Sequence, residues 1–165
     1  MPPKKTNLSS YNKKGVSVHP KTMIGIVVSE WNKEITEKLY KGAFDILTEL
    51  GVKKENIIRK NVPGSFELPY CAKFFIENTF VDAVICLGCV IQGETRHFEF
   101  ICQAVSQQIA KLNTDYNMPV IFGVLTTDTF EQAKARSGGK HGNKGVEAAI
   151  AAIKMLQLRD NIFAN

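Results

Sequence analysis

The stretch that decides the fold is residues 81–100, VDAVICLGCVIQGETRHFEF. It opens with a nearly continuous apolar run that ends at Leu87, as expected of a strand buried on both faces of a parallel sheet. A polar turn containing Gly93 follows, and apolar residues then recur with helical spacing from Phe98. The stretch therefore predicts a strand, a turn and a helix, with His97, one of three histidines, where the helix begins.

The same alternation runs through the rest of the chain. Apolar runs at residues 23–28, 56–62 and 118–125 predict three further strands, and helical periodicity predicts helices at 32–51, 66–78, 128–136 and 143–158. Strands that alternate with helices of this length indicate βαβ units with right-handed crossovers. We therefore predict an α/β protein, a three-layer α/β/α sandwich built on a four-stranded parallel sheet.

Local signals mark the ends of the predicted helices. Asn32 stands where an N-cap is expected, Gly51 supplies a stop, and Pro69 falls in a first turn where proline is tolerated. Asp128 and Glu131 have the spacing of a capping box. In the last helix we expect Val146, Ala149, Ile150, Ile153 and Leu156 to face inward.

The length of 165 residues fits one domain, which we place at residues 22–160 after an N-terminal extension at 1–21. The net charge of +5 falls to +1 without Lys4, Lys5, Lys13 and Lys14, so the basic character belongs mostly to the extension. No basic stripe interleaved with aromatic residues follows, which argues against nucleic-acid binding. Neither a membrane-spanning run nor a signal-peptide core is present, so we expect a cytoplasmic protein that binds no membrane.

Cysteine spacing raises a separate possibility. Cys86 and Cys89 form a C-x-x-C pair, which suits a redox couple or half of a zinc site. Cys86 lies inside an apolar run, however, and no second pair accompanies it, so we favour buried, reduced thiols and no metal.

Candidate functional residues gather where the predicted strands end, which is where open α/β sheets bind ligands. Trp31 either covers the core or offers a flat surface for stacking a heteroaromatic ring. Glu67 either favours a helix N-terminus or accepts hydrogen bonds from ligand hydroxyls. Phe122 fits core packing better by residue type. His97 has the near-neutral pKa range that suits proton transfer, and Thr95 is a candidate cap for its helix.

Two segments have the composition of anion sites. Residues 93–95, Gly-Glu-Thr, open a helix and would expose backbone amides to an anion. Residues 136–145 place Arg136, Lys140, His141 and Lys144 around four glycines, although the alternative of a solvated basic loop stays open. Neither segment is a Walker A loop.

Five segments together resemble the lumazine synthase family. They are VSEWN at 28–32, VPGSFELP at 62–69, LGCVIQGETRHFEF at 87–100, PVIFGVLTTDTFEQAKAR at 119–136 and HGNKGVEAA at 141–149. The resemblance implies a flavodoxin-like sheet and an enzyme of riboflavin biosynthesis that uses no metal or organic cofactor. Its reaction would condense 5-amino-6-(D-ribitylamino)uracil with 3,4-dihydroxy-2-butanone 4-phosphate, giving 6,7-dimethyl-8-ribityllumazine, phosphate and water.

The resemblance also implies a role for individual residues. His97 would transfer protons, and Glu94, Thr95 and Arg136 would bind the butanone phosphate. Asn32, Gly64, Gly93 and Lys144 would support the site. The pyrimidine and its ribityl chain would be held by Trp31, Ser65, Phe66, Glu67, Cys89, Val90, Ile91 and Phe122.

An oligomer follows from the same resemblance, because Phe122 and Arg136 would reach in from a neighbouring subunit. We expect a homo-pentamer that assembles into a 60-subunit icosahedral shell, since the linker at 137–142 is short as in shell-forming relatives, and association with riboflavin synthase is an open possibility.

Trp31 stands where many relatives have Phe, and Gln92 where Arg is common. A non-catalytic flavin-binding or structural shell protein is the alternative. A flavodoxin-like carrier would need a phosphate loop after the first strand, which residues 29–32 do not provide. A receiver domain would need an acidic cluster at the strand ends, and Glu30 alone does not make one.

Overall fold

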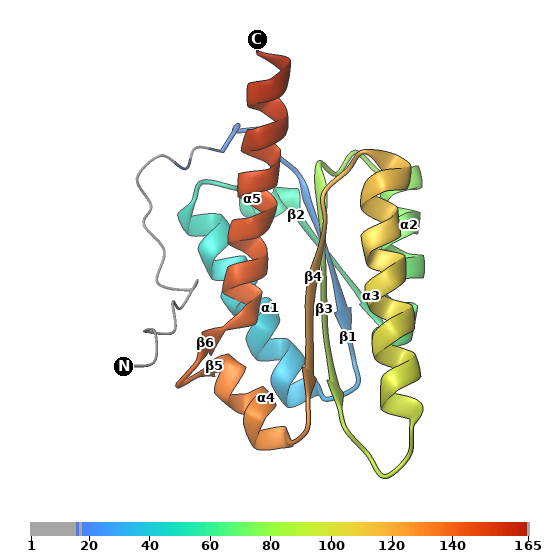
Figure 1. The fold of residues 1–165 in the computed structure, drawn as a ribbon. Helices are drawn as coiled ribbons and strands as arrows, with labels where there is room; N and C mark the ends of the chain where they lie inside the picture. Colours follow the sequence, from blue (N-terminus) through green and yellow to red (C-terminus); the bar gives the residue numbers. More distant parts are fainter. Residues whose placement is uncertain (1–15, 17, 165) are drawn as a thin grey trace, which may run out of the picture.

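The computed structural model describes residue 16 and residues 18–164, so the four lysines that argue for a basic extension lie outside the described residues. Its centre is a parallel sheet of four strands in the order β2-β1-β3-β4 (Figure 1). The strands are β1 (Ile24–Ser29), β2 (Ile57–Val62), β3 (Ala83–Ile91) and β4 (Val120–Thr127). The predicted fold class is confirmed.

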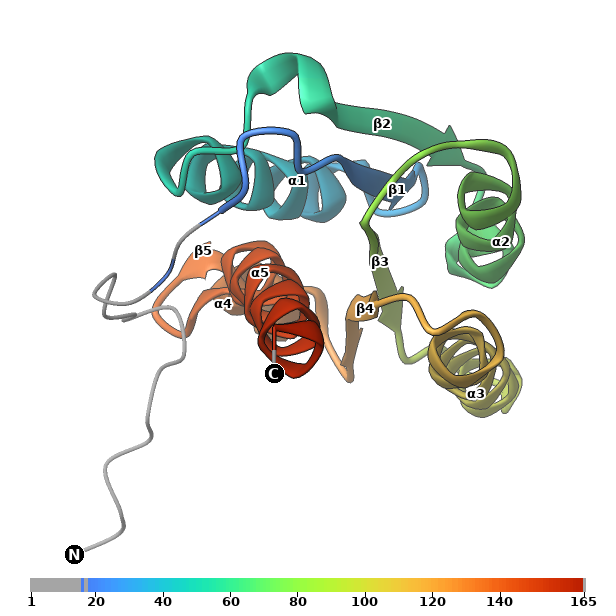
Figure 2. The same ribbon diagram turned by 90° about the horizontal axis from the view of Figure 1, so that it is seen from above.

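Within the described residues, five helices cover the two faces of the sheet. Helices α2 (Leu68–Asn78) and α3 (His97–Tyr116) lie on one face, and α1 (Lys33–Glu49), α4 (Phe130–Arg136) and α5 (Lys144–Phe163) on the other (Figure 2). Short 3-10 turns, η1 (Lys54–Asn56) and η2 (Ser65–Glu67), flank β2, and a small antiparallel hairpin of β5 (Ser137–Gly139) and β6 (Gly142–Asn143) joins α4 to α5. In the described part of the chain, no helix combines the length and apolarity needed to cross a membrane.

Alternating side chains of the strands supply two separate cores. Ile24, Ile26 and Val28 of β1 face α1 and α5, whereas Val27 faces α2 and α3. All are buried, because a central parallel strand is covered on both faces. The continuous apolar runs in the sequence follow from this two-sided burial.

Strand β3 continues four residues beyond its predicted end at Leu87. Instead of ending there, β3 stays paired with β4 through the last pair, Ile91 with Thr127. Gly88 is instead a place of close packing, because a Cβ built there would lie 2.5 Å from Ser65 Oγ. The glycine therefore lets η2 rest against the end of β3.

Helix ends follow the predictions in part. Gly51 has a φ of 102° and ends α1, and Pro69 lies in the first turn of α2, both as predicted. Asn32 does not cap α1 with its side chain. The capping box at Asp128 is also wrong: Thr129 caps α4 by accepting from the Gln132 amide at 3.2 Å. A sequence spacing of three cannot distinguish neighbouring cap candidates that both carry oxygen. Val146, expected to face inward, is only half-buried.

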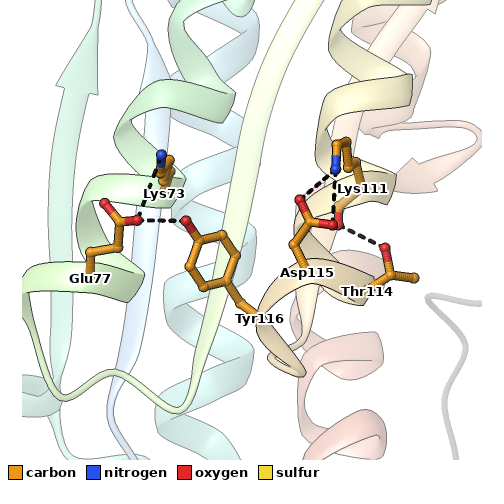
Figure 3. A network of polar contacts seen from close by, with 6 residues as sticks. All are labelled: Lys73, Glu77, Lys111, Thr114, Asp115 and Tyr116. Atoms are coloured by element: carbon orange, nitrogen blue, oxygen red, sulfur yellow. Dashed lines mark hydrogen bonds and ion pairs between the residues drawn. The ribbon is translucent and has the colours of Figure 1, made fainter.

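Helices α2 and α3 are joined near their C-terminal ends, at the amino edge of the sheet (Figure 3). The Tyr116 hydroxyl donates to the Glu77 carboxylate at 2.5 Å, and Lys73 lies 3.6 Å from the same carboxylate oxygen. This hydrogen bond to Glu77 raises the pKa of Tyr116 above its ordinary value. The network fixes the two helices at the edge opposite the candidate site.

Gly145 lets α5 pack closely against α1, because a Cβ built there would lie 1.9 Å from the Leu39 carbonyl oxygen. We expect Gly145→Ala to lower the free energy of unfolding by about 3 kcal/mol, since backbone atoms cannot move aside as a side chain does. Urea denaturation measures the loss. Gly93→Ala is the matched control, because its added Cβ meets nothing within 4 Å. Equal stability of the two variants would contradict the packing argument.

Candidate active site

Three turns meet at the carboxyl edge of the sheet, after β1, β2 and β3. The amides of Glu30 and Trp31 donate to the carbonyls of Val62 and Pro63 at 2.8 and 3.1 Å, which joins the first turn to the second. The Asn32 side-chain amide donates to the Cys89 carbonyl at 2.9 Å, which joins the first turn to β3. Apart from Phe122, the residues predicted to bind the pyrimidine thus come from segments that contact one another.

Trp31 and Phe66 present aromatic surface at this edge. Trp31 is 73% exposed and Phe66 57% exposed in the single chain. The alternative in which Trp31 covers the core is therefore wrong. An exposed indole on a turn that is hydrogen-bonded on both sides offers a flat surface to a planar ligand or to another protein chain.

Residues 64–67 hold a carboxylate and a hydroxyl in defined positions. The Gly64 amide donates to Glu67 Oε2 at 2.9 Å, so the Glu67 carboxylate is held against its own turn. Because a carboxylate accepts several hydrogen bonds, Glu67 keeps acceptor capacity for a ligand hydroxyl. The Ser65 hydroxyl is buried, and it has no hydrogen-bond partner among the described residues.

The end of β3 leads from buried to exposed positions. Cys89 is buried, Val90 and Ile91 are half-buried, and residues 92–97 are exposed. His97 is the first residue of α3, as predicted. Thr95 Oγ1 lies 3.4 Å from the His97 amide, too far for a strong cap. The turn at 93–95 and the His97 side chain are thus open to solvent, beyond the end of the strand to which the Trp31 turn is joined.

Arg136 and Phe122 lie apart from that group within one chain. Phe122 is in the middle of β4, paired with Cys86, and packs with the core under α2 and α3. Arg136 is the last residue of α4, which packs with α1 and α5 on one face of the sheet. Helix α3, which begins at His97, covers the opposite face (Figure 1). The structure therefore does not bring Phe122 and Arg136 together with Trp31 and Glu67.

The glycine-rich segment at 136–145 folds as a hairpin. Gly138 and Gly142 have φ values of 115° and 80°, as its tight turns require. The ends of the segment are already engaged: Arg136 Nη1 donates to the Gln132 carbonyl at 3.0 Å, and Lys144 pairs with Glu147 at 3.1 Å. These contacts hold each cation against its own helix, Arg136 against α4 and Lys144 against α5.

A polar cleft beside the Trp31 turn escaped the sequence analysis. It encloses about 430 Å³ between α1 and β2 and is lined by Ser29, Glu30, Lys33, Glu37, Arg59 and Asn61. Arg59 donates to the Glu37 carboxylate and lies 4.2 Å over the Tyr40 ring, and its hydrogen bond holds the pKa of Glu37 below the ordinary value. No sequence signal joins Arg59 to Glu37, because the pairing depends on how α1 packs against β2.

Cys86 and Cys89 cannot act as a pair. They are three residues apart on one strand, so their side chains point to opposite faces of the sheet, each into a different core. All four cysteines are free, and the described residues contain no group of three metal-ligating side chains. The redox and zinc alternatives therefore have no geometry to support them.

Burial predicts a clear order of thiol reactivity. Burial raises the pKa of Cys89 to about 12 and that of Cys86 as well. At pH 8 only about one Cys89 in 10⁴ is a thiolate, and the thiolate is the reactive form. We expect half-buried Cys71 and Cys102 to react with a disulfide reagent first, and all four thiols to react in denaturant. Mass mapping of the labelled peptides measures the order, and labelling of folded Cys89 as fast as Cys102 would contradict it.

The fold is a doubly wound α/β sheet. Proteins of this class bind ligands at the carboxyl ends of their strands. The chain belongs to the 6,7-dimethyl-8-ribityllumazine synthase family, whose model matches residues 21–160. A protein of that name from Cytophaga hutchinsonii is 61% identical over 150 residues, which are 91% of this chain and 94% of the relative. Those from Christiangramia forsetii and Porphyromonas gingivalis are 59% and 55% identical, over 93% and 92% of this chain and 92% and 94% of the relatives.

Proposed function

We propose that this chain condenses 5-amino-6-(D-ribitylamino)uracil with 3,4-dihydroxy-2-butanone 4-phosphate to 6,7-dimethyl-8-ribityllumazine, phosphate and water, the penultimate step of riboflavin biosynthesis. Family membership supports this reaction. The observation that carries it here is the joining of the Trp31 turn to both Pro63 and Cys89 beside His97. On this edge, the planar ring of the pyrimidine substrate and its ribityl chain can bind side by side, next to the His97 imidazole.

In this proposal the pyrimidine ring stacks on the exposed Trp31 indole. Phe66 and the segment Cys89, Val90 and Ile91 hold the ring and the start of the ribityl chain, and the oriented Glu67 carboxylate accepts from the ribityl hydroxyls. Gly64 supports that carboxylate through its amide. The buried Ser65 hydroxyl, which has no partner among the described residues, is suited to a hydrogen bond with the ligand.

The phosphate substrate is assigned to Glu94, Thr95 and Arg136. The turn at 93–95 precedes α3, where backbone amides favour an anion, and a guanidinium binds phosphate with two parallel hydrogen bonds. Lys144 adds positive charge nearby in sequence. His97 moves protons as the amine attacks the ketone, phosphate leaves and the second ring closes with loss of water. The chain's own contribution is to hold both substrates in register, which can account for much of the rate.

The positions of His97 and Arg136 support a site made by two copies of the chain. Their helices cover opposite faces of the sheet, and Arg136 ends α4 whereas His97 begins α3. This separation favours a site that takes the two residues from different chains. We therefore assign Phe122 and Arg136 to the neighbouring subunit's share of the site. Exposed aromatic residues of α2 and α3 are available to such an interface, namely Tyr70, Phe74 and Phe100.

For the assembly we propose a homo-pentamer in the cytoplasm. Because the hairpin at 137–143 is short, we further propose that pentamers close into a 60-subunit shell. Riboflavin synthase is the proposed partner of this assembly. Residues 22–160 form the single domain of each subunit in this scheme, and the family match supports these bounds. Light scattering should give the mass of sixty chains, each of 18.4 kDa. A mass of five chains would reject the shell and keep the pentamer.

Product formation tests the proposed reaction. Purified protein is mixed with both substrates, and the absorbance of the lumazine chromophore is followed against mixtures that lack protein or either substrate. We expect the chromophore to accumulate faster than in the protein-free mixture only when both substrates are present. A protein that binds flavin but leaves the rate of the protein-free mixture unchanged would be the non-catalytic alternative.

A further inference from the structure

Asn32 has a backbone conformation and a side-chain contact that the helix it precedes does not require. Its φ of 58° and ψ of 45° put it in the left-handed region, shared among described non-glycine residues only with Asn117. Its carbonyl accepts from the amides of Ile35 and Thr36 at 2.9 and 3.1 Å, which starts α1. Its side chain makes no capping bond and is free to act elsewhere.

The side chain acts on β3, at the point where β3 loses its partner. Backbone pairing of β1 with β3 ends at Val28 and Leu87, whereas β3 stays paired with β4 as far as Ile91. The Cys89 carbonyl therefore lies beyond the last backbone pair with β1. Asn32 Nδ2 donates to it at 2.9 Å, so a side-chain amide replaces the strand that has turned away.

This hydrogen bond joins two segments that are far apart in sequence and both belong to the proposed pyrimidine site. One carries Trp31, the residue directly before Asn32, and the other is the segment from Cys89 to Ile91. On its other side the Trp31 turn is tied to Pro63. Without the Asn32 amide, the turn would be held to the neighbouring strands on one side only.

We infer that Asn32 is a positioning residue: its amide clamps the Trp31 turn to the Cys89 carbonyl and so fixes the Trp31 indole before the pyrimidine arrives. The inference rests on the proposed function for its substrate. The clamp itself is a property of the unliganded chain. A preformed aromatic surface lowers the ordering that binding requires, so its loss should weaken pyrimidine binding more than it slows the chemistry.

Two variants isolate the clamp, and a second asparagine supplies their controls. Asn32→Asp keeps the size and the tolerance of the left-handed conformation but cannot donate to Cys89. Asn32→Gly keeps the conformation and removes the side chain. Asn117→Asp and Asn117→Gly are the matched controls, because Asn117 is also left-handed, with a φ of 49°. Asn117 lines a cavity at the amino edge of the sheet, away from the proposed site.

Because Trp31 is the only tryptophan, its fluorescence anisotropy reports the clamp in the full chain without substrate. Both Asn32 variants should show faster local motion of Trp31 and a KM for the pyrimidine raised about tenfold, with kcat within about threefold of the wild type. The Asn117 variants should match the wild type in both respects, and circular dichroism confirms that each variant is folded.

Three results would overturn the inference. The first is wild-type KM and Trp31 motion in a folded Asn32→Gly protein. The second is a raised KM with unchanged Trp31 motion, which would make Asn32 a direct substrate contact. The third is an equal effect of the Asn117 variants, which would indicate general loosening. Absence of product from the wild type would instead reject the proposed reaction, and the anisotropy comparison would still decide whether the clamp exists.

Discussion

Replacing His97 by alanine should lower kcat by about 10²-fold and leave pyrimidine binding nearly unchanged. An imidazole can both donate and accept a proton, and the reaction needs several proton transfers there. The loss should stop well short of abolishing turnover, because holding the two substrates in register contributes independently of proton transfer. Steady-state kinetics with saturating phosphate substrate, together with Trp31 quenching by the pyrimidine, separates the two effects.

His19→Ala is the matched control for this prediction. His19 precedes β1 at the opposite edge of the sheet, where its Nδ1 accepts from the Lys21 amide at 3.2 Å. The same imidazole is lost there without a change in the proposed site, so kcat should stay at the wild-type value. An unchanged kcat in the His97 variant would remove His97 from the mechanism.

Replacing Arg136 by alanine should raise the KM for the phosphate substrate about tenfold or more, with a smaller effect on the pyrimidine, since a guanidinium forms charge-assisted hydrogen bonds to phosphate. Arg159→Ala is the control. Arg159 lies 3.6 Å from Asp82 at the amino edge, and its loss removes an equal charge far from the proposed site. A normal KM for the phosphate substrate in the Arg136 variant would count against the assignment.

The two variants together test whether the site spans two chains. If His97 and Arg136 of one site belong to different subunits, a coexpressed mixture of the two variants contains some sites that have both residues. Random assembly of equal amounts should give such a site about one time in four, and activity should recover accordingly. No recovery in an assembly proven to be mixed would place both residues of a site in one chain.

Periodicity predicted the architecture because the central strands β1 and β3 are buried on both faces. The continuous run at β1 and the helical spacing in α3 both arise from that burial. The edge of the sheet that carries the candidate site was also predictable, because the carboxyl ends of parallel strands all lie at one edge. The turns that carry Trp31 and Glu67 lie at that edge, where the Trp31 amide donates to the Pro63 carbonyl.

Contacts that depend on three-dimensional packing were not predictable. The strand was predicted to end at Leu87, but Gly88 lies within β3 against Ser65. Gly145 was one of the glycines of a candidate anion site, but it packs against the backbone of Leu39. Asn32 was predicted to cap a helix, and its side chain instead bonds to Cys89, 57 residues away. In each case the residue type indicated a local role, whereas a distant segment determines the contact.

The central claim is catalysis of the condensation. Its most direct test is the simultaneous measurement of lumazine and inorganic phosphate, with both substrates in about hundredfold excess over protein. The account predicts many turnovers per chain and one phosphate released for each lumazine formed, at a rate far above the protein-free mixture. Lumazine formation that equals the protein-free rate, or that stops at one molecule per chain, would contradict it.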